Sequence, residues 1–153
     1  MKRDFGTAAL GGGVGGLLDA IYATVLWGFI LGGNPAGIWQ SVASGLIGKS
    51  ALDGGTATAA LGLALHFFIA FVMALVYVLA SRRLPVLIAR PIVMGMLYGL
   101  VLYVVMNFVV VPLSAIGFRP LNLWGAVRAL LPHILFVGPA IGLITARRAR
   151  TAR

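Results

Sequence analysis

Four long apolar stretches, separated by short loops, occupy most of this chain of 153 residues. They run over residues 8–31, 56–80, 91–111 and 126–146. Each is close to or above the ~20 residues that an α-helix needs to cross ~30 Å of hydrocarbon. Because no water reaches backbone groups there, every N–H and C=O must be paired inside its own segment. The sequence therefore predicts an all-α protein, an integral membrane bundle of four transmembrane helices.

Composition supports the same class of protein. Hydrophobic residues make up 61% of the chain and charged residues 10%, whereas a soluble domain has roughly 45–50% and about 25%. A soluble fold of this size could not hide so much apolar surface. No long linker and no soluble module interrupts the pattern, so residues 1–153 are expected to form a single transmembrane domain.

The net charge of +9 is distributed unevenly along the chain. If the N-terminus is cytoplasmic, nine basic residues fall on the inner side and three on the outer side. The nine are Lys2, Arg3, Arg82, Arg83, Arg90, Arg147, Arg148, Arg150 and Arg153, and the three are Lys49, Arg119 and Arg128. The positive-inside rule then predicts that both termini are cytoplasmic. The basic tail, residues 147–153, is expected to contact anionic lipid headgroups, and the lack of interleaved aromatic residues disfavours a nucleic-acid partner.

The first outer loop, residues 32–55, contains a segment that is too apolar for a free loop and too short to span. Its apolar positions follow a near-helical spacing, with polar residues largely on the other side: Ile38, Val42, Leu46 and Ile47 against Gln40, Ser41 and Ser44. This pattern predicts a short interfacial or re-entrant helix with Trp39 in the aromatic belt.

Small residues recur every four positions along the predicted spans. The glycines of these rows are Gly12, Gly16, Gly62, Gly95, Gly99, Gly138 and Gly142. Packing, rather than hydrophobicity, drives helix association in lipid, and small residues let backbones approach closely. We expect these glycines at helix–helix contacts, first of all within the bundle and alternatively between copies in a homo-oligomer.

Each predicted span also carries one strongly polar side chain at membrane depth. These residues are Asp19, His66, Asn107 and His133, and Tyr22 and Tyr103 are placed to join them. An aspartate at the centre of a span costs roughly 2.5–3.5 kcal/mol on insertion scales. Asp19 should therefore face the bundle interior, either protonated or paired, and His66 at similar depth is the expected partner. The alternative is a hydrogen-bonded clasp that only fixes the register of the helices.

Several stretches together resemble a family of small bacterial inner-membrane proteins with four spans and no assigned function. They include Ala43-Ser-Gly-Leu-Ile-Gly48, Asp53-Gly-Gly-Thr-Ala57, Leu61-Gly-Leu-Ala-Leu-His66-Phe and Tyr98-Gly-Leu-Val-Leu-Tyr103-Val-Val-Met-Asn107. The resemblance implies four spans in a bacterial inner membrane. It carries no activity and no catalytic residues over to this chain.

Three functions remain open from the sequence. The first is a small transporter- or channel-like protein that handles protons or a small solute at Asp19 and His66. The second is a non-catalytic accessory or assembly subunit of a larger membrane complex. The third is a haem b protein with His66 and His133 as axial ligands and Gly62 leaving room for the macrocycle.

An enzyme is not expected. The chain has no cysteine and no nucleophile, base and orienting group at recognisable spacing. No resident metal is expected, and apart from the haem alternative no cofactor.

Overall fold

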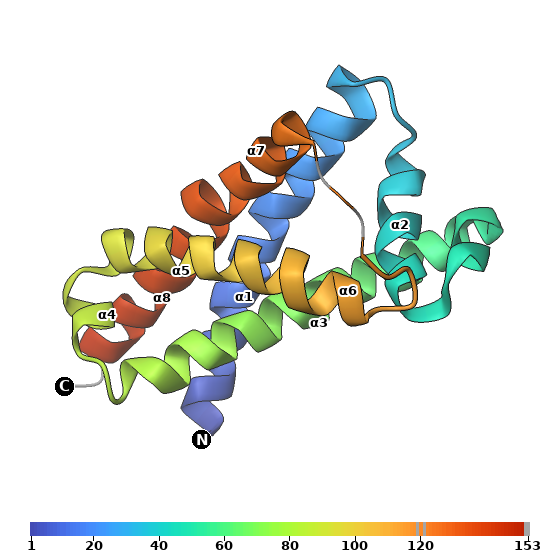
Figure 1. Ribbon diagram of the computed structural model, residues 1–153. Helices are drawn as coiled ribbons and strands as arrows, with labels where there is room; N and C mark the ends of the chain where they lie inside the picture. The colour runs from blue at the N-terminus through green and yellow to red at the C-terminus, as the bar shows by residue number, and fades with distance from the viewer. Residues whose placement is uncertain (119, 121, 152–153) are drawn as a thin grey trace.

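The computed structural model describes residues 1–118, 120 and 122–151, and within these the chain is helical with no strand (Figure 1). Four helices in this part of the chain are long and apolar enough to cross a membrane: Lys2–Ile30, Gly55–Ser81, Pro91–Leu113 and Leu123–Arg150. The predicted all-α bundle of four spans is confirmed. Two basic residues of the predicted charge distribution, Arg119 and Arg153, lie outside the described residues.

Three of the four spans consist of more than one helical segment. The first is α1 (Lys2–Ala23) followed by the π-helix η1 (Thr24–Ile30), and the second is α3 (Gly55–Ser81) alone. The third is α5 (Pro91–Val105), the π-helix η3 (Met106–Val110) and α6 (Val111–Leu113). The fourth is α7 (Leu123–Pro132), the π-helix η4 (His133–Val137) and α8 (Gly138–Arg150).

The spans alternate in direction, so the basic residues gather at one end of the bundle. We call this the basic end; it holds Lys2, Arg3, Arg82, Arg83, Arg90, Arg147, Arg148 and Arg150. The short helix α4 (Val86–Ala89) connects α3 to α5 there. The opposite end, which we call the far end, holds the tip of η1 and the starts of α3 and α7 (Figure 1).

The helix predicted in the first loop is present as α2 (Pro35–Ile47). Asn34 caps it, because its side-chain oxygen accepts the backbone N–H of Ala36 at 3.0 Å and Pro35 stands at the first helical position. Gly48, at a φ of 75° that favours glycine, ends the helix before the 3₁₀ turn η2 (Lys49–Asp53). The helix α2 folds back from the tip of η1 and crosses α3 (Figure 1).

The glycine rows lie at contacts between helices of this one chain. A Cβ atom on Gly12 would lie 2.6 Å from the carbonyl oxygen of Ala70, and one on Gly95 would lie 2.6 Å from that of Gly138. Added Cβ atoms on Gly62 and Gly99 would overlap backbone carbonyl oxygens of neighbouring segments. Packing within the bundle, the first of the two interpretations, therefore accounts for these rows.

Candidate functional site

The pair Asp19 and His66 lies between α1 and α3 at matched depth. Asp19 is eleven residues before the end of η1, and His66 is eleven residues after the start of α3. At 1.5 Å per residue each lies about 16 Å from the far end of its span. The carboxylate oxygen Oδ2 of Asp19 is 3.9 Å from Nδ1 of His66, so the two side chains expected to pair do meet.

Glycines bring the two helices close enough for this meeting. Gly12 and Gly16 face α3, and a Cβ on Gly16 would lie 3.0 Å from Cβ of Ala70 and 3.2 Å from the ring of Phe67. With the backbones this near, Nε2 of His66 reaches the carbonyl oxygen of Gly16 at 2.9 Å. One ring nitrogen of His66 therefore bonds the backbone of α1, and the other faces the Asp19 carboxyl group of the same helix.

The hydrogen bond to Gly16 determines where the first proton of His66 lies. A carbonyl oxygen only accepts, so Nε2 must carry the hydrogen and donate it. In the neutral ring Nδ1 is then an acceptor, and the ionised form of the Asp19 carboxyl group that it faces also only accepts. One further proton, on Nδ1 or on the carboxyl group, turns this pair of facing acceptors into a donor and an acceptor. The geometry thus leaves a position for one proton between the two groups.

Aromatic rings surround His66. The ring of Trp39, from α2, meets the imidazole edge-on at 5.4 Å between centroids, and that of Phe67 does so at 5.3 Å. The side chains of His66 and Asp19 remain 16% and 20% exposed in the single chain. The ring of Trp39 lies beside His66, about 16 Å along α3 from its first residue at 1.5 Å per residue. Its place in the aromatic belt, and the interfacial or re-entrant position of α2, stay predictions.

Tyr22, one turn beyond Asp19 on α1, has a different partner. Its hydroxyl donates to the carbonyl oxygen of Arg128 at 3.1 Å. Pro132 has no N–H, so this carbonyl lacks its usual donor one turn later in the helix. The tyrosine replaces that donor and ties α1 to α7.

The remaining candidates lie elsewhere in the bundle. In His133, Nδ1 donates to the carbonyl oxygen of Ala129 on its own helix at 2.8 Å, and the ring meets that of Tyr103 at 6.4 Å. Asn107 donates to the Tyr103 carbonyl at 2.9 Å. Asn107 also lines a mostly apolar groove of about 450 Å³ between α2, α3 and η3. Among the described residues, Asp19 has no ion-pair contact with His133.

The haem interpretation does not fit this donor set. Nε2 of His66 is engaged by the Gly16 carbonyl, and the ring is enclosed edge-on by Trp39. The space beside Gly62 that the macrocycle would need is filled by α2, because an added Cβ there would overlap the Trp39 carbonyl oxygen. With Nε2 bonded to Gly16 and no flat cavity left beside the ring, these residues do not fit a macrocycle.

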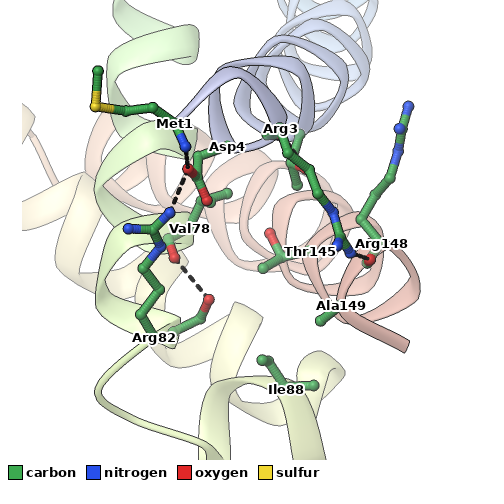
Figure 2. Close-up of a pocket in the computed structure, with 11 residues that line it drawn as sticks. Met1, Arg3, Asp4, Val78, Arg82, Ile88, Thr145, Arg148 and Ala149 are labelled. Atoms are coloured by element: carbon green, nitrogen blue, oxygen red, sulfur yellow. Dashed lines mark hydrogen bonds and ion pairs between the residues drawn. The ribbon is translucent and has the colours of Figure 1, made fainter. Parts of the chain in front are cut away.

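Sequence reasoning did not identify a polar cluster at the basic end. Arg82, directly after α3, forms an ion pair with Asp4 of α1, and the guanidinium of Arg3 donates to the carbonyl oxygen of Arg148 on α8 (Figure 2). The available signal was Asp4, an acid directly after Lys2 and Arg3 at the start of the first span.

Comparisons with protein-family models, with curated proteins and with solved structures found no match to this chain.

Proposed function

We propose that this protein is a small membrane transporter or channel that handles protons, or a small solute together with a proton, at the Asp19–His66 pair. The observation that carries the proposal is the 3.9 Å separation of two ionisable groups inside two apolar spans. An aspartate at such depth costs roughly 2.5–3.5 kcal/mol on insertion scales. A polar contact between spans returns on average only ~0.6 kcal/mol, so packing alone gives little reason to keep the acid.

The proposed step is a simple proton relay. A proton binds the Asp19 carboxylate or His66 Nδ1, where one proton converts the two facing acceptors into a bonded pair. It then leaves from either group toward the opposite side of the membrane. Nε2 keeps its hydrogen and donates it to the Gly16 carbonyl oxygen throughout, which holds the ring in place. Trp39 packs edge-on against His66, and in this proposal its movement admits or excludes water.

Assembly is part of the proposal. Asp19 is one-fifth exposed in the single chain, so a second copy or a partner protein is needed to keep its side chain away from lipid. The glycine rows are occupied by contacts within the chain, so such an interface uses other surfaces. A bacterial inner membrane with both termini in the cytoplasm completes the proposal, supported by the uneven distribution of basic residues and by the family resemblance.

Proton flux into liposomes tests this function. The purified protein is reconstituted with a pH-sensitive dye inside, and a potassium gradient with valinomycin drives protons inward. We expect wild-type flux above that of empty liposomes and a drop of at least about tenfold in Asp19→Asn, a loss of about 1.4 kcal/mol of barrier lowering.

The matched control is Asp53→Asn, the same change at an exposed position in η2. It should retain wild-type flux. If wild-type liposomes stay silent while the protein co-purifies with a larger complex from native membranes, the accessory-subunit interpretation replaces this one. If Asp19→Asn conducts as well as wild type, the proton site is not there.

A further inference from the structure

A separate cavity of about 380 Å³ lies at the basic end, between the start of α1 and the ends of α3 and α8 (Figure 2). Its walls include Arg3, Asp4, Arg82, Thr145 and Arg148. The Asp19–His66 pair lies nearer the far end of the bundle, and this cavity lies at the basic end. A ligand bound in this cavity is therefore independent of the proposed function.

Thr145 is the unusual residue of this cavity. It is 4% exposed, and its hydroxyl oxygen has no hydrogen-bond partner among the described residues. A buried hydroxyl without a partner costs about 1–3 kcal/mol. Figure 2 shows this hydroxyl directed into the space between Arg3 and Arg82. A ligand in the cavity would supply the missing acceptor.

The charge of the walls determines what kind of acceptor fits. The guanidinium groups of Arg3 and Arg82 and the N-terminal amine of Met1 lie at the cavity against the single carboxylate of Asp4, which pairs with Arg82 and with that amine. Arg3 donates to a neutral carbonyl, that of Arg148, so its charge is not compensated there. Excess positive charge beside an unsatisfied hydroxyl favours an anion with several acceptor oxygens.

We propose that this cavity binds a phosphate group, with Arg3 supplying the charge and the Thr145 hydroxyl donating to a phosphate oxygen. Guanidinium groups match phosphate oxygens in geometry, and the hydroxyl adds one short bond. The phosphate can belong to an anionic lipid headgroup or to a soluble phosphate. A lipid headgroup can reach the cavity because the cavity lies at the end of the spans. Its chemistry is the same in both cases.

Native mass spectrometry of the full chain, purified and stripped of lipid in detergent, tests the proposal. Phosphatidylglycerol is titrated into wild-type, Arg3→Gln and Thr145→Val protein. We expect one retained lipid per chain in the wild type, about tenfold weaker retention in Arg3→Gln and about fivefold weaker in Thr145→Val, as loss of a charged and of a neutral hydrogen bond implies. The control is Arg83→Gln, which removes the same charge at the basic end from an exposed residue outside the cavity.

Thr145→Val also separates binding from folding. Because its hydroxyl is unsatisfied, its removal should leave the melting temperature of the lipid-free protein unchanged or raise it while binding weakens. A soluble source is tested with inorganic phosphate in place of lipid. If phosphate alone raises the melting temperature of the wild type but not of Arg3→Gln, the cavity binds soluble phosphate and the proposal stands. If neither probe binds, or if both cavity variants behave as Arg83→Gln does, the proposal is wrong.

Discussion

The two histidines of this chain show how the same side chain at membrane depth acquires different properties. His66 bonds another helix through Nε2 and faces a carboxylate through Nδ1. His133 bonds the carbonyl of Ala129 on its own helix and has only an aromatic neighbour in Tyr103. The first arrangement has a vacant position for one proton between two acceptors. The second satisfies a helix backbone locally, so depth alone does not indicate chemistry.

Glycines at helix contacts nevertheless pack both sides of the bundle, the side with His66 and the side with His133. On the His66 side, Gly12 and Gly16 admit the backbone of α3, and on the His133 side Gly99 admits that of η4. This shared packing makes the difference in chemistry testable, because variants can be matched across the two sides.

The largest effect is expected from filling the close contact beside His133. In Gly99→Ala the new Cβ would overlap the His133 carbonyl oxygen, so α5 and η4 must separate. We expect a loss of stability of about 3 kcal/mol, the upper part of the range for overpacking. Unfolding in mixed detergent, followed by circular dichroism, measures it. Gly13→Ala is the control, since nothing lies within 4 Å of a Cβ there; equal stability of the two variants would show that this contact is not formed.

The second effect separates the histidines by function. His66→Gln should lower proton flux in liposomes at least about tenfold, a change of about 1.4 kcal/mol, because no titrating ring then faces Asp19. His133→Gln should retain flux within about twofold, because that ring bonds a backbone carbonyl. An equal loss of flux in the two variants would mean that the different partners of His66 and His133 do not give the two residues different functions.

Some features of this fold and of the candidate site could be predicted from the sequence. The spans were predictable because length and hydropathy are local properties, and helix ends such as the Asn34 cap follow local rules. The meeting of Asp19 with His66 was predictable because the cost of an unpaired acid restricts where it can lie.

The other partners depend on how each helix is rotated, and rotation is set by packing between distant segments. Pro132 leaves the Arg128 carbonyl without its usual donor by a local rule, but the donor that replaces it is Tyr22, which was expected to join Asp19. The position of Trp39 beside α3 depends on the contact between its backbone carbonyl and Gly62. No local sequence pattern indicates that contact.

A smaller effect is expected from the hydroxyl of Tyr22. Tyr22→Phe removes its bond to the Arg128 carbonyl and should cost about 0.6 kcal/mol, the average for polar contacts between membrane helices. Tyr103→Phe serves as the control, because that tyrosine contacts His133 through its ring. The same detergent unfolding assay measures both. If the two variants lose equal stability, Tyr22 does not substitute for the donor that Pro132 lacks.

The smallest effect concerns the ion pair at the basic end. Asp4 and Arg82 join α1 to α3 on the same side of the bundle as the His66 pair, but the Arg82 side chain is 55% exposed. Water and salt screen such a pair, so Arg82→Gln should cost about 0.5 kcal/mol or less at low ionic strength and nothing measurable at high ionic strength. A double-mutant cycle with Asp4→Asn isolates the coupling between the two side chains. A coupling that persists in high salt would mean that solvent does not screen this pair although the Arg82 side chain is 55% exposed. The contrast with the less exposed Asp19–His66 pair would then disappear.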